Sequence, residues 1–196
     1  MIAIIDYDAG NTFSVMNTLR RLNAHYILTS DLAIIKKADK VILPGVGHAG
    51  AAMDELKKRN LIEVIKGITQ PVLGICVGMQ LMYDFSEEGD TKCLGIVPGK
   101  IVRFKNEPGV KIPHMGWNNN QYIINSDEGI LKNSYEQETY FVHSYYAPVN
   151  VYTVAICEYS VQFSSYIRYK WFHAVQFHPE KSGPVGATII KNFLEL

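Results

Sequence analysis

The sequence feature that most constrains the fold is a series of short apolar runs, separated by helix-like stretches, in the first half of the chain. The runs cover residues 2–5, 26–28, 41–43 and 72–75. They are apolar on both sides, so both faces of each expected strand are buried. Strands of this kind are typical of a parallel sheet that is covered by helices.

The stretches between the runs carry the spacing of amphipathic helices. After the first run, Val15, Leu19 and Leu22 recur at helical spacing, which predicts a β-turn-α unit at the start of the chain. Residues 51–59 contain a similar apolar stripe. Residues 185–193, which follow a Gly-Pro pair, predict a closing helix that packs back on the sheet.

The second half of the chain has a different pattern, which predicts a mixed or antiparallel extension of the sheet. Strand-like segments cover residues 101–104, 121–124, 139–145, 151–158, 161–167 and 171–177. The chain has 196 residues, of which 47% are hydrophobic, enough for one domain with a sizeable core. We therefore expect a single α/β domain spanning residues 1–196.

Charge and cysteine usage exclude several classes of function. The chain contains 19 Lys and Arg against 19 Asp and Glu, so it lacks the positive field that gathers nucleic acid. The apolar start ends at Asp6, too early for a signal peptide or a membrane span. Cys76, Cys93 and Cys157 are odd in number and widely spaced, which excludes a disulfide framework and a zinc knuckle. These features predict a cytoplasmic protein with a free thiol.

One of the three cysteines lies between two glycines. Gly74-Ile75-Cys76-Val77-Gly78 follows an apolar run and precedes a helical pattern through residues 81 and 82, as in a strand-turn-helix nucleophile elbow. A helix N-terminus at Cys76 favours the reactive thiolate. Considered alone, the pentapeptide fits a small buried cysteine at a strand end better than a nucleophile.

A histidine and a glutamate near the C-terminus supply a base and a group that orients it. Because Pro179 disfavours helical geometry at His178, we expect an extended tripeptide in which His178 and Glu180 share a face. Glu180 then accepts the Nδ1 proton while the other nitrogen receives the cysteine proton. The alternatives are a solvated surface turn and a metal site, but the six histidines show no HExxH or similar ligand spacing.

A glycine-bearing loop follows the apolar run that ends at residue 43. In Gly45-Val46-Gly47 the backbone amides can face a ligand without obstruction by side chains. Such amides can hold a developing oxyanion, which lowers the barrier by about 3–4 kcal/mol for each donor. An ordinary connecting turn is the alternative.

Taken together, these motifs resemble the class I, triad-type glutamine amidotransferases over essentially the whole chain. Segments 5–7, 10–11 and 43–47 are typical of the superfamily. The segments P-H-M-G-W-N at 113–118 and F-V-H-S-Y at 141–145 resemble the branch of glutaminase subunits that serve imidazole glycerol phosphate synthases. Further matching segments are 74–80, 98–100 and 177–183. The resemblance implies a three-layer α/β fold with a central, mostly parallel sheet and an antiparallel portion in the C-terminal half.

The resemblance also implies a reaction and a substrate. Cys76 forms a γ-glutamyl thioester from L-glutamine, with His178 as base and then acid and Glu180 as its orienter. The oxyanion hole is formed by the backbone of Gly45, Val46 and Gly47 together with the elbow amide at Val77. The residues that hold glutamine are Gln80, Glu88, His143, Ser144 and Tyr145. The resemblance implies no cofactor and no metal.

The same resemblance implies a partner that uses the ammonia in histidine biosynthesis. This partner is a (β/α)₈-barrel cyclase that forms a heterodimer with the chain. The expected interface residues are Asn11, Trp117, Asn118, Tyr140 and Lys181. Trp117 is open to an alternative as core, and residues 118–120 as a turn.

Three other functions remain open. The first is a paralogous glutaminase subunit for a barrel synthase in sugar or surface-polymer chemistry. The second is a free-standing γ-glutamyl hydrolase. The third, a binding module without activity, normally has a damaged triad, whereas Cys76, His178 and Glu180 are all present.

Overall fold

The first half of the computed structural model alternates strands and helices, as the apolar runs predict. The structure describes residues 1–123, 129–134 and 137–196. In chain order the first elements are β1 (Ile2–Ile5), α1 (Thr12–Arg21), β2 (Tyr26–Thr29), α2 (Leu32–Lys37), β3 (Lys40–Leu43), α3 (Ala49–Lys58), α4 (Leu61–Lys66), β4 (Val72–Ile75) and α5 (Val77–Gln80).

The second half is richer in strands. Its elements are β5 (Tyr83–Ser86), β6 (Thr91–Lys92), β7 (Val97–Arg103), β8 (His114–Asn119), β9 (Gln121–Tyr122), η1 (Gly129–Leu131), β10 (Glu138–His143), β11 (Tyr145–Tyr146), β12 (Thr153–Tyr159), β13 (Val161–Tyr169), β14 (Phe172–Val175), η2 (Pro179–Lys181) and α6 (Gly183–Leu194). The expected closing helix is thus confirmed as α6.

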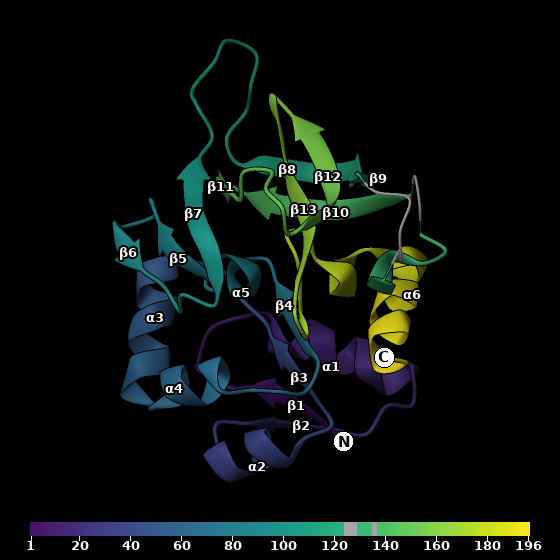
Figure 1. Cartoon of the computed structure of the whole chain (residues 1–196). Helices are drawn as coiled ribbons and strands as arrows, with labels where there is room; N and C mark the ends of the chain where they lie inside the picture. Colours follow the sequence, from purple (N-terminus) through teal and green to yellow (C-terminus); the bar gives the residue numbers. More distant parts are fainter. Residues whose placement is uncertain (124–128, 135–136) are drawn as a thin grey trace.

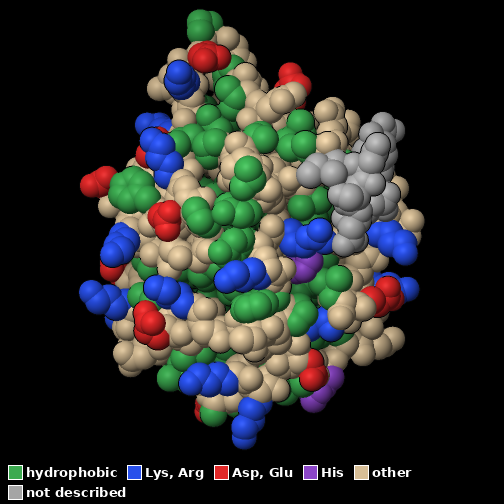
Figure 2. Space-filling view, viewed as in Figure 1, with side chains coloured by type: hydrophobic (Ala, Val, Ile, Leu, Met, Phe, Trp, Pro, Cys, Tyr) green, Lys and Arg blue, Asp and Glu red, His purple; other side chains and the backbone are tan. Residues whose placement is uncertain are grey.

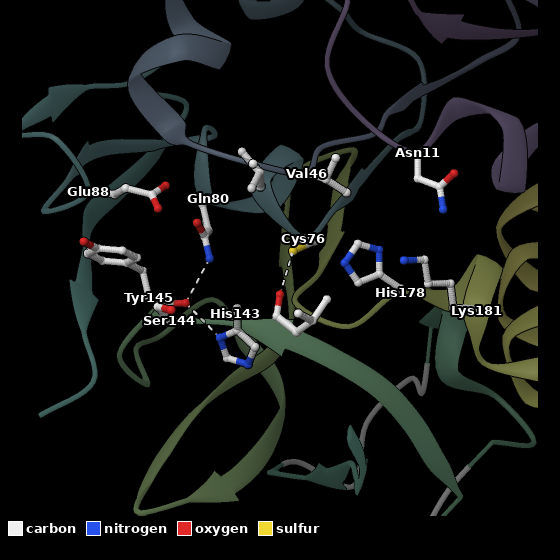
Figure 3. A pocket seen from close by; sticks show the side chains of 13 residues that line it. Asn11, Val46, Cys76, Gln80, Glu88, His143, Ser144, Tyr145, His178 and Lys181 are labelled. Atoms are coloured by element: carbon white, nitrogen blue, oxygen red, sulfur yellow. Dashed lines mark hydrogen bonds between the residues drawn. The ribbon is translucent and has the colours of Figure 1, made fainter. Parts of the chain in front are cut away.

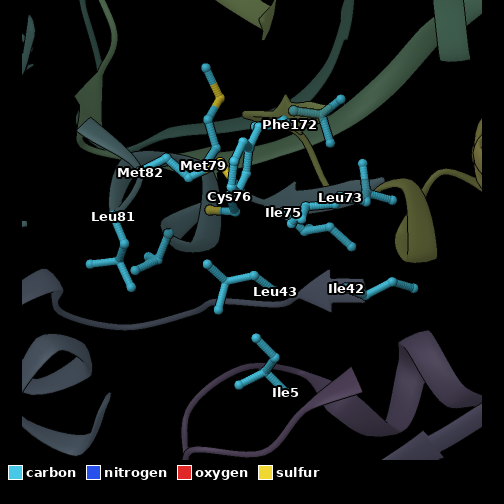
Figure 4. Packing of buried hydrophobic residues seen from close by; sticks show 14 of the residues in the cluster. Ile5, Ile42, Leu43, Leu73, Ile75, Cys76, Met79, Leu81, Met82 and Phe172 are labelled. Atoms are coloured by element: carbon cyan, nitrogen blue, oxygen red, sulfur yellow. The ribbon is translucent and has the colours of Figure 1, made fainter. Parts of the chain in front are cut away.

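One large sheet organises the molecule. Its strand order is β2-β1-β3-β4-β14-β13-β12-β9. The first five strands in this order, β2, β1, β3, β4 and β14, run parallel to one another. Helices α1 and α6 lie on one side of it, and α3 and α4 on the other (Figure 1). The parallel strands β1 and β4 are buried along their whole length because helices cover both faces. In Figure 4, Ile5 of β1 and Leu43 lie below Cys76, and Leu73 and Ile75 of β4 lie beside it.

The antiparallel portion is present but more divided than the sequence predicts. Strands β13, β12 and β9 extend the large sheet antiparallel to one another. β8 pairs with β10 in a separate two-stranded sheet, and β7 joins β11, β5 and β6 in a third sheet. The expected strand at 139–145 is interrupted at Ser144, because Tyr145–Tyr146 leaves β8 to pair with β7. The expected strand at 121–124 is observed at Gln121–Tyr122, and its last residue lies outside the described part of the chain.

One further local expectation, and one of the alternatives left open, are wrong. The helix after Cys76 ends at Gln80, because Leu81 and Met82 are fully buried and lead directly into β5. Residues 118 and 119 are not in a turn but at the end of β8.

The surface fits the balanced composition. Lys and Arg side chains are interspersed with Asp and Glu on the face shown in Figure 2. Within the described residues, no helix combines the length and the apolar character needed to cross a membrane.

Candidate active site

The candidate site lies where three neighbouring parallel strands end. β3 pairs with β4, and β4 pairs with β14, so the segments that follow these strands emerge side by side. These segments carry the glycine loop, Cys76 and His178 respectively. The carboxyl edge of an open parallel sheet is the usual place for a ligand site, and here the sheet brings all three motifs to that edge.

Cys76 has the geometry of an elbow. Its backbone has φ 52° and ψ −109°, a strained conformation for a residue with a side chain, and α5 begins at the next residue. The Cys76 amide donates to the Val175 carbonyl at 2.8 Å, which ties the elbow to β14. The side chain is 3% exposed, so the thiol faces a nearly closed space.

His178 and Glu180 are paired, although not through the extended tripeptide that the sequence predicts. His178 is extended, but Pro179 begins the short helix η2, so Glu180 turns back under the imidazole. Nδ1 of His178 lies 2.7 Å from Glu180 Oε1, and both side chains are 1% exposed. The pairing is therefore as expected, while the local backbone is helical because Pro at a first helical position favours a turn.

The free nitrogen of the imidazole faces the thiol. Among the described residues, His178 Nε2 has no hydrogen-bond partner of ordinary length, and Figure 3 shows the ring beside Cys76. Burial lowers the pKa of His178, but the charge of the Cys76 sulfur and the contact with Glu180 outweigh it and raise the pKa to about 10. The site therefore favours the imidazolium form of His178 at neutral pH.

The glycine loop and the elbow contact each other through their backbones. A Cβ on Gly45 would lie 2.3 Å from the Gly78 nitrogen, and a Cβ on Gly78 would lie 2.0 Å from the Leu43 carbonyl oxygen. The preceding carbonyl, of Pro44, accepts a 2.5 Å hydrogen bond from the buried Tyr7 hydroxyl. Both glycines are thus required for the loop to lie against the elbow.

This contact gives a stability prediction. Gly78→Ala is expected to lower the free energy of unfolding by about 3 kcal/mol or more. The added Cβ would meet backbone atoms, which cannot shift without moving the neighbouring chain. Urea titration measures the change. The matched control is Gly50→Ala in α3, where the new Cβ meets only the side chains of His48 and Thr91. Equal stability of the two variants would contradict the close packing.

A pocket of about 320 Å³ opens at this edge, within the size range of small-molecule sites. Figure 3 shows Gln80, Glu88 and Tyr145 on one side of Cys76, with His178 and Lys181 on the other. The residues that line the pocket are Asn11, Val46, Gly47, Cys76, Val77, Gln80, Glu88, Val142, His143, Ser144, Tyr145, His178 and Lys181. Gly45 and Glu180 are not part of this lining, but Gly45 lies against Val77 and Glu180 is bonded to His178.

The polar side chains of the pocket are themselves held in place. Gln80 is 2% exposed, and its Nε2 donates to the Tyr145 carbonyl at 2.9 Å. The Glu88 carboxylate accepts a 2.7 Å hydrogen bond from the Ala49 amide at the start of α3. Among the described residues, no three His, Cys, Asp or Glu side chains cluster as metal ligands.

Two residues of the site have no role predicted from the sequence, although Ser182 lies within the matching segment 177–183. Gln176 is fully buried, and its Nε2 lies 3.7 Å from the Cys76 sulfur. The Ser182 hydroxyl donates to the His178 carbonyl at 2.6 Å and accepts from the Tyr140 amide at 3.0 Å. Only the buried Phe177 separates Gln176 from the H-P-E motif, so its proximity to that motif is the one signal that could have indicated a role.

The expected interface residues lie at the pocket mouth and on the paired strands β8 and β10 beside it. Asn11 and Lys181 belong to the pocket wall, and Lys181 Nζ lies 5.9 Å from the centre of the Tyr140 ring. Tyr140 in turn packs edge-on against Trp117, with ring centres 6.0 Å apart. Trp117 is 53% exposed, which excludes a core position in this chain. Asn118, the next residue, is half-buried.

Two buried histidines next to the pocket predict a loss of stability in acid. Burial lowers the pKa of His114 to about 4 and that of His143 to about 3. The ordinary value in an unfolded chain is about 6.5, so between pH 6.5 and 4 the unfolded state binds more protons. The two neutral histidines therefore contribute their full stabilisation above pH 6.5. As the pH falls below this value, the free energy of unfolding decreases by on the order of a few kcal/mol.

Chemical denaturation at pH 7.5 and pH 4.5 measures this change. The variant with both His114→Asn and His143→Asn cannot take up these protons, so its stability should fall less over the same range. A wild-type slope equal to that of the double variant would contradict the prediction.

Comparison with known proteins gives a consistent result along the whole chain. The sequence model described as glutamine amidotransferase class-I matches residues 3–196. The chain is 49% identical to the imidazole glycerol phosphate synthase subunit HisH of Bacteroides fragilis, covering 100% of this chain and 99% of that one. It is 50% identical to the subunit of the same name from Haemophilus influenzae, covering 99% and 96%.

Solved structures share the fold at much lower identity. A putative GMP synthase protein from Thermoplasma acidophilum superposes with a TM-score of 0.72 over 99% of this chain and 92% of that chain. The two sequences are 19% identical. This likeness supports the three-layer fold alone.

Proposed function

Because the chain belongs to the class I glutamine amidotransferase family, and within it to the HisH subunits of imidazole glycerol phosphate synthase, we propose which residues carry its reaction and which partner receives the product. The chain is a glutaminase of histidine biosynthesis that works with a partner subunit. The observation that carries the residue assignment is the pairing of His178 with Glu180 beside the buried thiol of Cys76.

In the proposed reaction Cys76 is the nucleophile. Its sulfur attacks the side-chain carbonyl of glutamine, and His178 donates its proton to the departing nitrogen, so that ammonia leaves and a γ-glutamyl thioester remains. His178 then takes a proton from water as the water attacks the thioester, which releases glutamate and restores the thiol. Glu180 keeps the imidazole oriented and stabilises its positive form.

The glycine loop is the proposed site of the oxyanion. The negative oxygen formed in each step requires amide donors close to Cys76. The amide of Val77, at the start of α5, and the backbone of Gly45, Val46 and Gly47 are the nearest candidates, since the loop lies against the elbow. The exposed and glycine-rich end of the loop at Gly47, with φ 91°, can adopt more than one arrangement.

The remaining pocket residues are proposed to hold glutamine. Glu88 provides a negative group for the α-amino end of the substrate. Gln80 and the backbone of His143, Ser144 and Tyr145 form the other wall. Substituents on the α-carbon of glutamine require such polar anchors, whereas the methylene groups do not.

We further propose a (β/α)₈-barrel cyclase as the partner. Trp117 and Met115 on β8 are 53% and 62% exposed, and such large exposed side chains are typical anchors of a protein interface. Asn11, Asn118, Tyr140 and Lys181 would complete this face around the pocket mouth. The proposal includes the whole of residues 1–196 as one domain and a cytoplasmic location, which the three free thiols support.

A coupled assay tests the proposal. Glutamate release is measured for the lone chain, for the chain with the barrel subunit, and for the complex with the ribonucleotide substrate of that subunit. We expect weak hydrolysis by the lone chain and a strong increase in the complex, because the loop at Gly47 requires closure. Full turnover by the lone chain on γ-glutamyl peptides would instead favour a free-standing hydrolase, and activation only by another barrel synthase would favour a paralogue.

A further inference from the structure

We propose that His114 and His143 are positioning residues of the glutaminase, joined to Cys76 by a continuous chain of hydrogen bonds. The inference rests on the proposed function, since its effect is on that reaction. The chain of bonds begins at Asn118 on β8 and passes through both histidines to the carbonyl of Tyr145. From there it continues through Gln80 and Gln176 to the sulfur.

In the outer half of this chain of bonds, from Asn118 to Tyr145, one acceptor determines which atom donates in every bond. The Tyr145 carbonyl can only accept, so Nδ1 of His143, at 2.8 Å, carries the proton. The Nε2 of a neutral His143 is then bare and accepts from Nδ1 of His114 at 3.1 Å. By the same reasoning, Nε2 of His114 is bare and accepts from the Asn118 amide nitrogen at 3.4 Å.

The orientation of Asn118 agrees with this direction. Its amide nitrogen also donates to the Glu158 carbonyl on β12 at 3.0 Å, and its oxygen accepts from the Asn119 amide at 2.8 Å. Both contacts place the nitrogen toward His114. One tautomer of each ring is therefore consistent with every neighbour.

Burial and stacking hold the two rings in position. His114 is 3% exposed and His143 is 6% exposed. The His114 ring is stacked on Tyr159, with centres 4.1 Å apart, and on Phe141 at 4.9 Å. A buried polar network is rigid when every member is satisfied, as both imidazoles are here.

The inner half of the chain of hydrogen bonds, from Tyr145 to Cys76, ends at the nucleophile. The Gln80 amide nitrogen has two protons: one bonds the Tyr145 carbonyl at 2.9 Å and the other bonds Gln176 Oε1 at 3.1 Å. Because Oε1 of Gln176 accepts, its Nε2 faces Cys76 and lies 3.7 Å from the sulfur. An amide donor at this distance supports negative charge on the thiol.

The arrangement assigns a purpose to two imidazole side chains that have no role in the proposed reaction, in which His143 contributes only its backbone. His143 fixes the Tyr145 carbonyl, this carbonyl fixes Gln80, and Gln80 sets which end of Gln176 meets the sulfur. The outer end, Asn118, follows the exposed Trp117 on β8. A partner seated on that face would therefore contact the strand from which the chain of bonds starts.

The tautomers can be measured directly in the intact chain, without any variant. We expect ring ¹⁵N chemical shifts at neutral pH to show protonated Nδ1 and bare Nε2 for both His114 and His143. A protonated Nε2 on either ring would overturn the proposal. This measurement is independent of glutamine hydrolysis, so it also stands if the proposed function fails.

Two substitutions at His143 test the effect on the reaction in the complex with the barrel subunit. His143→Phe keeps a buried ring but removes the donor to Tyr145, and we expect kcat/KM for glutamine to fall about ten- to a hundredfold. His143→Asn keeps an N–H near the position of Nδ1 and should recover most of this loss. Synthesis from added ammonia should be unchanged in both variants.

The matched control is His173→Phe. His173 is also 6% exposed and bonds the Tyr166 hydroxyl at 2.7 Å, but it belongs to none of the contacts described above. Two outcomes with an active wild type would show that the positioning role is wrong. One is equal kcat/KM for His143→Phe and His173→Phe. The other is a kcat/KM for His143→Asn that is no higher than for His143→Phe. If wild type itself releases no glutamate in the complex, the proposed function fails instead.

Discussion

Replacement of Cys76 by serine should lower glutamine hydrolysis by about four orders of magnitude or more, the usual effect of removing a nucleophile. A serine hydroxyl at this position is far less ionised than a thiol, although the elbow geometry is kept. Synthesis from added ammonia by the complex should remain intact, because the partner carries out that step. Glutamate release and product formation, measured on the same samples, check both statements.

The control for this variant is a thiol away from the pocket. Cys157 is fully buried on β12, and burial raises its pKa to about 12, so it is expected to be unreactive. Cys157→Ser should retain glutaminase activity and labelling of Cys76 by a glutamine-like electrophile. Loss of ammonia-dependent synthesis in Cys76→Ser would show that the substitution disrupts the complex rather than the reaction.

Glu180→Gln is expected to have the second largest effect, a fall in kcat of about a thousandfold. The amide can still accept the proton of His178 Nδ1 but carries no charge, and the imidazole is buried. Burial lowers the pKa of His178, and Cys76 and Glu180 both raise it, so loss of the carboxylate lowers the pKa from its value of about 10. A smaller share of His178 then carries the proton that the departing nitrogen needs.

The pH profile of kcat distinguishes this cause from simple misfolding. In Glu180→Gln the profile should lose activity at a lower pH than in wild type, while the midpoint of thermal unfolding changes little. Glu195→Gln is the matched control, because that carboxylate is exposed and pairs only with Lys191 among the described residues. An unchanged pH profile in Glu180→Gln would mean that the carboxylate does not set the charge of His178.

The sequence predicts those parts of the site that depend on local chain geometry. Glycines around Cys76 permit a tight elbow, so this geometry can be inferred without the fold. The pairing of His178 with Glu180 is also predicted, but the extended backbone expected between them is wrong because Pro179 begins η2. The parallel half is predicted because each apolar run is itself the sign of a buried strand. Most of the other details that fail are decided by a residue distant in the sequence.

Gln176 and β8 illustrate this limit. Gln176 is one more residue of a strand-like segment until the sheet brings it to a sulfur 100 positions away in sequence. β8 contains Gly116 and a run of asparagines, which disfavour a strand, but it forms because β10 pairs with it from His114 to Asn119. The short helix after Cys76 likewise ends because the core takes up Leu81, not because of a local stop signal.

The order of the strands has a consequence for the newly made protein. β14 is one of the last strands in the sequence, yet it inserts between β4 and β13 in the middle of the sheet. During synthesis from the N-terminus, Cys76 therefore emerges from the ribosome about a hundred residues before the base that activates it, and the sheet beside it stays open until the end. A chain that is broken off early carries the thiol without His178 or its pocket wall, so incomplete products cannot consume glutamine.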